Sequence, residues 1–154
     1  MANTYTQIYI HIVFTVKGRQ NLIGKEWKES LHKYICGITK ANGQKLLVIN
    51  SMPDHVHILI GLTPDIALSD LVRDIKANSS RFINEQHWVQ GRFQWQEGFG
   101  AFSCSHSQLE KVITYIQNQD KHHARKTFME EYLNLLRRSG IQYDARYLFE
   151  PVNE

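Results

Sequence analysis

The sequence predicts an α+β fold of the ferredoxin-like (split βαβ) kind: an antiparallel sheet with helices on one face and an additional C-terminal helix pair. Apolar residues alternate with other residues in some segments and recur at helical spacing in others. The resulting order is β-α-β-β-α-β followed by helices, which is the split βαβ order. Because no internal repeat or Gly/Ser-rich linker divides the chain of 154 residues, we expect residues 1–154 to form one domain, with a tail from about residue 141.

The first half of the chain contains three predicted strands and one helix. Residues 5–15 alternate at the period of a strand. Residues 24–41 carry apolar side chains at helical spacing, and Gly43 follows where a helix would end. The apolar run within residues 45–52 predicts a buried strand, and residues 55–62 alternate again after a Pro-Asp turn.

The second half contains one more strand and three helices. An apolar stripe predicts a helix over residues 69–84, and the aromatic-rich segment 93–105 predicts a strand interrupted by glycines. Ser107 and Glu110 match the capping-box pattern and are expected to begin a third helix. A fourth helix is expected over residues 127–138. The split βαβ order places two helices on one face of the sheet and leaves the other face uncovered, where the third helix or a partner molecule can pack.

Composition excludes several classes of protein. Hydrophobic residues make up 42% and charged residues 21%, which excludes wholesale disorder. No run approaches the ~20 apolar residues of a transmembrane helix, and the start of the chain lacks the features of a secretory signal, so we expect a cytoplasmic protein with no membrane partner. The two cysteines lie far apart, which disfavours a disulfide framework or a zinc finger. A net charge of +3 permits a nucleic-acid partner without requiring one.

Two histidines lie two residues apart on the strand predicted at residues 55–62. His55 and His57 point to the side opposite Val56 and Ile58, so both imidazoles leave the face away from the presumed core. Two imidazoles at this spacing can bind one metal ion. With eight histidines in the chain, however, the pair alone is weak evidence for a metal site.

The third predicted helix carries a polar stripe beside its apolar one. Tyr115, Gln119 and His122 occupy positions i, i+4 and i+7 and therefore share this stripe. Tyr115 is expected at the edge of the core, where a tyrosine commonly packs its ring and leaves its hydroxyl to water. The stripe by itself does not separate a catalytic tyrosine from a structural one.

Together, the two sites resemble those of the HUH single-strand nucleases. The closest resemblance is to the single-tyrosine transposases of the smallest bacterial insertion sequences and their REP-associated relatives. It rests on the segments PDHVHIL (53–59), FQWQEGF (93–99), YIQNQ (115–119) and GIQYDARYL (140–148). It extends over roughly residues 4–148, and the motifs occur in the family's order.

This resemblance implies a tyrosine that attacks a phosphodiester of single-stranded DNA. Carried over, Tyr115 would form a 5′-phosphotyrosine link and release a 3′-OH, and a second 3′-OH could reverse the step. The pKa of a free phenol is about 10, so the tyrosine needs help to lose its proton at neutral pH. His55, His57 and Gln119 would hold a divalent metal, Mg²⁺ or Mn²⁺, that offsets charge on the phosphate. No small-molecule cofactor is implied.

The resemblance also implies a DNA hairpin with adjacent single-stranded DNA as the partner, and a homodimer. Basic side chains would contact the phosphates, and the candidates are Arg81, Lys121 and Arg125. The nearly uninterrupted strand at residues 8–13 could pair across a two-fold axis.

Two other functions stay open at this point. A ferredoxin-like sheet with exposed aromatic residues also suits a module that binds a nucleic-acid hairpin without cutting it, although no RNP-like string is present. A metal-dependent phosphodiesterase would hydrolyse DNA without ever holding it covalently, and the spacing of Tyr115 and Gln119 would then be accidental.

Overall fold

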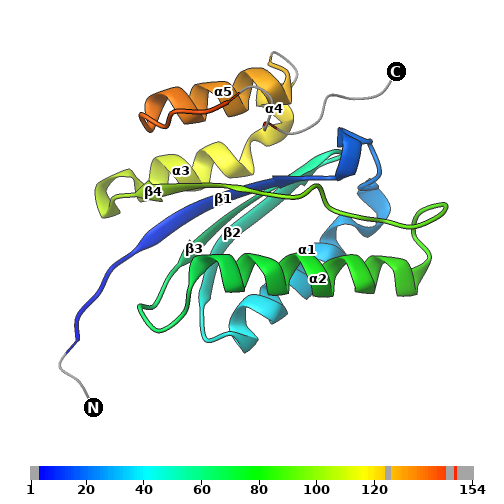
Figure 1. The fold of residues 1–154 in the computed structure, drawn as a ribbon, viewed down its shortest axis with the longest axis horizontal. Helices are drawn as coiled ribbons and strands as arrows, with labels where there is room; N and C mark the ends of the chain where they lie inside the picture. Colours follow the sequence, from blue (N-terminus) through cyan, green and yellow to red (C-terminus); the bar gives the residue numbers. More distant parts are fainter. Residues whose placement is uncertain (1–3, 124–125, 145–147, 149–154) are drawn as a thin grey trace.

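The elements follow the split βαβ order that the sequence predicts (Figure 1). The computed structural model describes residues 4–123, 126–144 and 148. Its helices and strands, with two 3₁₀ turns, are β1 (Tyr9–Thr15), η1 (Lys17–Arg19), α1 (Lys25–Ala41), β2 (Lys45–Met52), β3 (His55–Gly61), α2 (Leu68–Gln86), β4 (Gly100–Cys104), η2 (His106–Gln108), α3 (Leu109–Gln117), α4 (Gln119–His123) and α5 (Phe128–Arg138). Within the described ranges, no helix combines the length and apolar character needed to cross a bilayer.

The four strands form one antiparallel sheet in the order β2-β3-β1-β4. β1 lies in its interior, because Tyr9–Thr15 pairs with β3 on one side and Tyr9–Val13 pairs with β4 on the other. The expectation that residues 8–13 pair across a two-fold axis is therefore wrong. The edges of the sheet are β2 and β4.

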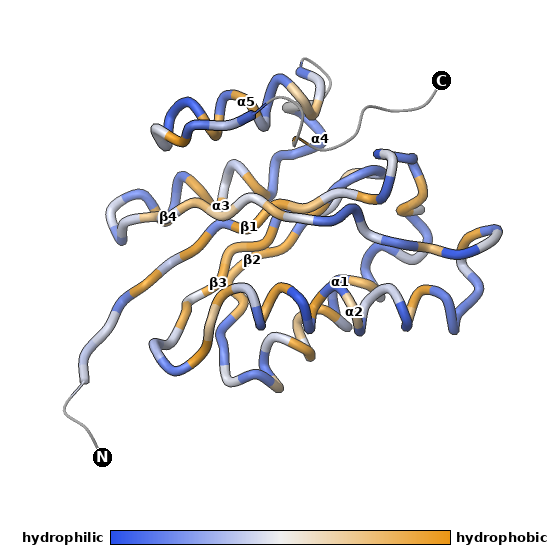
Figure 2. The backbone as a smooth tube through the Cα atoms, in the orientation of Figure 1, coloured by the Kyte–Doolittle hydropathy of each residue, from blue (hydrophilic) through white to orange (hydrophobic). Residues whose placement is uncertain are grey.

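Helices α1 and α2 cover one face of the sheet and enclose the main core (Figures 1 and 2). The alternation of β3 places Val56, Ile58 and Ile60 on this face, all fully buried. Each such side chain contributes about 1.5–3 kcal/mol relative to an exposed one. The core therefore fixes the register of β3, and with it the direction of the histidines between these residues.

Helices α3 and α5 cover the opposite face (Figure 1). Phe128, Tyr132 and Leu136 of α5 pack against Val13 and Phe102 of the sheet. Gly100 of β4 permits this approach, because a Cβ atom there would lie 2.7 Å from the Tyr132 hydroxyl. The C-terminal helix pair predicted from the sequence thus closes the sheet face that the split βαβ unit leaves open.

Both the first and the last strand start later than predicted, and β1 begins at Tyr9 and not at residue 5. β4 starts only at Gly100, because segment 93–99 is attached to α2 instead: Asn84 accepts from the Phe93 amide at 2.7 Å and donates to its carbonyl at 3.1 Å. Trp95 makes one isolated bridge to β1's neighbour Val16. This attachment buries Phe93 and Trp95, so these aromatic rings belong to the core.

The third predicted helix begins and ends differently as well. The capping box is formed by Ser105 and Gln108, two residues before the predicted Ser107 and Glu110, and it opens η2. The helix is then interrupted at Asn118, between α3 and α4. Tyr115 and Gln119, which the sequence places on one helix, therefore belong to two consecutive ones.

Candidate active site

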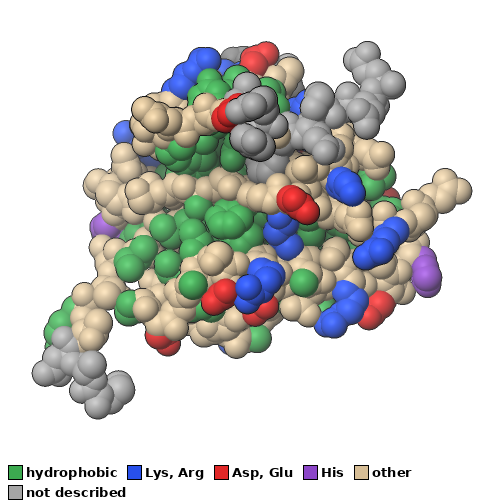
Figure 3. All heavy atoms as spheres, viewed as in Figure 1, with side chains coloured by type: hydrophobic (Ala, Val, Ile, Leu, Met, Phe, Trp, Pro, Cys, Tyr) green, Lys and Arg blue, Asp and Glu red, His purple; other side chains and the backbone are tan. Residues whose placement is uncertain are grey.

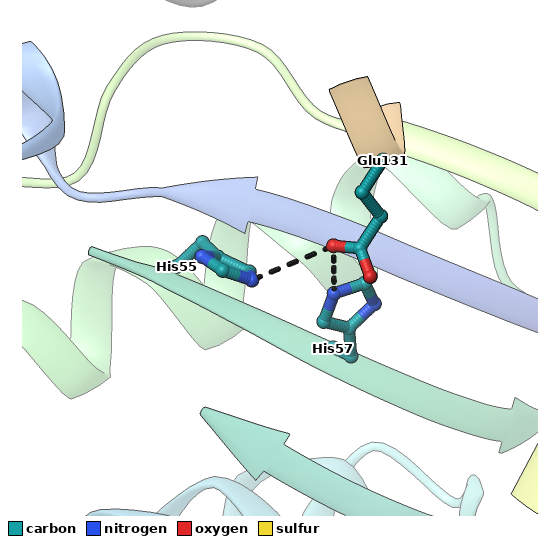
Figure 4. Close-up of side chains that lie close together, drawn as sticks. All are labelled: His55, His57 and Glu131. Carbon is teal, nitrogen blue, oxygen red and sulfur yellow. Dashed lines mark hydrogen bonds and ion pairs between the residues drawn. The ribbon is translucent and has the colours of Figure 1, made fainter. Parts of the chain in front are cut away.

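Three buried side chains converge between β3 and α5 (Figure 4). His57 Nε2 lies 3.0 Å from Glu131 Oε1, and His55 Nε2 lies 3.6 Å from the same oxygen. One ligand atom from each residue falls within 4.8 Å of the others. Two imidazole nitrogens and a carboxylate oxygen are a donor set that suits divalent metal ions.

The carboxylate reaches this site because of how α5 begins and packs. Thr127 is the N-cap, and its side chain accepts from the Glu130 amide at 3.2 Å. Phe128 and Tyr132 then anchor the helix on the sheet. Glu131 lies between them in sequence and points the same way, so that it is only 5% exposed.

The second ring nitrogen of each histidine, Nδ1, lies within hydrogen-bonding distance of a neighbouring side chain. His55 Nδ1 is 2.7 Å from Asp54 Oδ1, and His57 Nδ1 is 2.8 Å from Nε2 of His11 on β1. Burial, reinforced by the neighbouring His57, lowers the pKa of His11 to about 3, so His11 is neutral at pH 7. These contacts fix both rings with Nε2 directed at Glu131, an arrangement typical of histidines that bind metals.

The Tyr115 side chain on α3 reaches the same carboxylate. Its hydroxyl donates a hydrogen bond to Glu131 Oε2, and its ring centroid lies 6.0 Å from that of His57. Burial raises the pKa of Tyr115, and the charge and hydrogen bond of Glu131 raise it further, while Gln119 and Arg138 act in the opposite direction. The phenol is therefore held protonated in this arrangement.

Gln119 is fully buried at the start of α4 and faces Glu131 as well. Its amide nitrogen donates to Glu131 Oε2 at 3.1 Å and lies 3.5 Å from the Tyr115 carbonyl oxygen. The group beside the histidine pair is thus a carboxylate, with the Gln119 amide behind it.

The end of α3 is tied to the sheet next to the histidines. Asn50 of β2 lies opposite His57 in the strand register. Its side-chain amide donates to the carbonyls of Ile116 at 2.9 Å and Gln117 at 3.4 Å. Because carbonyls at a helix C-terminus lack partners within the helix, this contact both satisfies them and holds Tyr115 near β3.

The structure does not bring the expected basic residues together at this site. Arg81 lies on α2, in the helix layer on the other side of the sheet, and its guanidinium donates to Asn78 Oδ1 at 2.7 Å. Lys121 is exposed on α4. Arg125 lies outside the described residues.

Sequence reasoning missed Glu131, His11 and Asp54. Glu131 had a usable signal: it is an acidic residue on the stripe of α5 that contains Phe128 and Leu135, where a core-facing side chain is expected. A carboxylate in such a stripe indicates a buried partner, because an unpaired buried charge is costly. His11 and Asp54 carried no such signal, since their roles depend on strand pairing and on a turn.

Comparison with known proteins places the chain among transposases. The profile of the family described as "Transposase IS200 like" matches residues 4–119, well over half of the chain. The ISDra2 transposase TnpA of Deinococcus radiodurans is 28% identical over 120 residues, covering 73% of this chain and 84% of the relative. The IS200 transposase of Salmonella typhimurium is 23% identical over 138 residues, covering 88% and 89%.

Two solved structures share the fold. A protein of Deinococcus radiodurans R1, described as a candidate transposase, matches with a TM-score of 0.62 at 25% identity, over 77% of this chain and 95% of that one. A REP-associated tyrosine transposase, solved bound to a REP hairpin, matches with a TM-score of 0.62 at 14% identity, over 100% and 96%. At that identity the second match shows the shared fold alone.

Proposed function

The chain belongs to the family of IS200-like transposases, and from this premise we propose that it cleaves and rejoins single-stranded DNA next to a hairpin, with Tyr115 as nucleophile and a divalent metal as cofactor. The observation that carries the proposal is the double contact of Glu131. One oxygen of this carboxylate accepts a hydrogen bond from the Tyr115 hydroxyl, and the other lies close to the Nε2 atoms of His55 and His57. The nucleophile and the metal-binding nitrogens therefore share one site.

The reaction forms one bond and breaks one. The Tyr115 oxygen attacks the phosphorus, the bond to the 3′ oxygen breaks, and the products are a 5′-phosphotyrosine link and a 3′-OH. Glu131, which accepts the hydrogen bond from Tyr115, is placed to take the phenol proton, and the leaving 3′ oxygen takes a proton from water to become the 3′-OH. A second 3′-OH can then displace Tyr115, which rejoins the strands without an external energy source.

The residues at the site fit a divalent cation, Mg²⁺ or Mn²⁺. His55, His57 and Glu131 would hold it, and the Gln119 amide, bonded to the same carboxylate, stays a proposed ligand through its oxygen. Bound there, the cation offsets negative charge on the phosphate oxygens. The His11 contact suits this role, because His57 can keep its proton on Nδ1, donate it to His11 and leave Nε2 free for the metal.

We propose that hairpin DNA lies in the groove of about 1440 Å³ between α2 and segment 87–99. Arg81 lines this groove together with other basic side chains, namely Lys17, Arg73, Lys76 and Arg92. Figure 3 shows Lys and Arg side chains over α2 and the segment that follows it. Phosphate contacts by such side chains supply affinity and little sequence preference. Lys121, exposed on α4, and Arg125 stay proposed contacts to the DNA.

Two further features of the proposal concern assembly and location. The homodimer that the resemblance implies stays a proposal, as does a cytoplasmic location. Tyr115, His55 and His57 meet within one chain, which supports a site built by a single copy.

An adduct assay tests the function. The protein is incubated with Mn²⁺ and a DNA hairpin carrying a single-stranded flank, and the products are separated on a denaturing gel. Wild type and Tyr34→Phe, a matched control on α1, form a covalent protein–DNA band, whereas Tyr115→Phe forms none. If the DNA is cleaved without a covalent protein–DNA band, and Tyr115→Phe still cleaves it, the protein is a phosphodiesterase. If the protein binds the hairpin equally well with and without EDTA and never cleaves it, the protein is a hairpin-binding module.

A further inference from the structure

A cleft of about 770 Å³ opens beside Tyr115, between β4, α3 and α5. We call it the α3–α5 cleft; its inner end is formed by His11, Phe102, Tyr115 and Glu131. It lies on the opposite side of the sheet from the groove that Arg81 lines. The nucleophile is therefore reached from this cleft and not from the α2 groove.

The walls of the α3–α5 cleft are basic. Lys111 precedes Tyr115 by one helical turn, Lys126 stands just before α5, and Arg138 ends α5. All three side chains are exposed. Among the described residues that line the cleft, the only acidic one is Glu131, which is buried at its inner end. The mouth thus presents three positive charges to whatever approaches Tyr115.

Most of this charge comes from a part of the chain outside the family match. The matched residues end at 119, so Lys126 and Arg138 both lie beyond them. Without α5, Tyr115 would lie on an open surface with Lys111 as its single basic neighbour from this set. The helix that brings Glu131 into the site thereby also supplies a second wall.

We propose that the α3–α5 cleft binds the single-stranded flank of the DNA, with Lys111, Lys126 and Arg138 as contacts to the phosphates next to the scissile one. The volume suits a few nucleotides of single strand, being in the range of pockets that enclose small ligands. Polar groups on the walls, among them Gln108, Asn134 and Ser139, can contact sugars and bases. This inference rests on the proposed function and adds the path by which the strand reaches Tyr115.

The test compares a hairpin without a flank and the same hairpin with one, by fluorescence anisotropy in EDTA so that no cleavage occurs. The triple variant Lys111→Gln, Lys126→Gln, Arg138→Gln is set beside a control that removes charges from α1, Lys33→Gln with Lys40→Gln. For the flanked hairpin, removing three phosphate contacts lowers the slope of log K against log salt by about 2. Raising the salt fourfold then weakens wild type about 20-fold more than the triple variant.

The flank should strengthen binding in wild type and in the α1 control, and most of that gain should disappear in the triple variant. An unchanged gain and an unchanged salt slope would overturn the proposal, as would an equal loss in the α1 control. Circular dichroism and thermal unfolding show whether the triple variant remains folded, which is expected because all three side chains are exposed. The single variant Lys126→Gln provides a second, milder test. If the flank effect is absent but Tyr115 still forms its covalent adduct, only the proposal that the α3–α5 cleft binds the flank is rejected. If the flank effect is present but no adduct forms, only the proposed role of Tyr115 as nucleophile is rejected.

Discussion

Replacing Glu131 by glutamine removes one of the three groups that would hold the metal while keeping the size of the side chain. His55, His57 and Glu131 place their ligand atoms within 4.8 Å of one another, so each should contribute directly to binding. Loss of a residue that merely orients a ligand already costs about 10–100-fold in metal affinity. We expect Glu131→Gln to weaken Mn²⁺ binding by at least that factor.

The effect on stability follows by linkage. With Mn²⁺ at 100 times the wild-type dissociation constant, binding stabilises wild type by about 2.7 kcal/mol. If the dissociation constant rises 10–100-fold, the same Mn²⁺ concentration contributes only about 0.4–1.4 kcal/mol. For a chain of this size, 1 kcal/mol corresponds to about 2–4 °C in Tm, so the wild-type shift is about 5–11 °C and the variant shift about 1–6 °C.

Thermal unfolding with and without Mn²⁺ measures both shifts. Glu130→Gln is the matched control, because Glu130 precedes Glu131 on α5 and its side chain is exposed; its Mn²⁺ shift should equal that of wild type. An undiminished Mn²⁺ shift in Glu131→Gln would refute the assignment of this carboxylate to the metal site, and Gln119 would then be the group to substitute next.

Two more predictions concern contacts beside the site, and a third concerns a half-buried histidine on α1. His11→Leu should weaken Mn²⁺ affinity about 10–100-fold without removing a ligand, because His11 holds His57 at 2.8 Å; an unchanged metal titration contradicts this. Asn50→Ala removes two hydrogen bonds to the end of α3, and should lower stability by about 1–3 kcal/mol and slow adduct formation while leaving Mn²⁺ affinity unchanged; an unaltered adduct rate speaks against it. Burial and the nearby charge of Lys28 lower the pKa of His32 to about 4, so the unfolded state binds this proton first and stability is lost as pH falls from about 6.5 towards 4. His32→Gln, which can keep a bond to Ser51, should lose less stability over that range in urea unfolding, and an identical pH dependence would exclude the effect.

Local patterns were sufficient for most of the fold. The alternation in residues 55–62 predicted both a strand and the face on which His55 and His57 lie, because the side-chain period of a strand is two whatever its neighbours are. Where two local patterns overlap, the sequence alone does not show which one forms. Ser105 with Gln108 and Ser107 with Glu110 both fit a capping box, and only the turn after β4 selects the first.

Patterns along the chain predict the histidine pair and the stripe with Tyr115 and Gln119, and the resemblance joins the two, but neither predicts Glu131 or His11. Glu131 joins His57 across 74 positions, and His11 joins it across 46. Such contacts depend on strand order and on where α5 docks, which no local period encodes. For the same reason the expected pairing of residues 8–13 with a second copy was wrong: whether a strand has a free edge depends on the whole sheet.

Locating the DNA on the protein tests the role of Tyr115 as nucleophile most directly. The covalent adduct is trapped in Mn²⁺, digested with nuclease and protease, and examined by tandem mass spectrometry. With Tyr115 as nucleophile, a nucleotide is attached through its 5′ phosphate to the peptide containing Tyr115, in wild type and in Tyr34→Phe alike. A nucleotide on any other residue, or cleaved DNA with every peptide unmodified, would contradict this role.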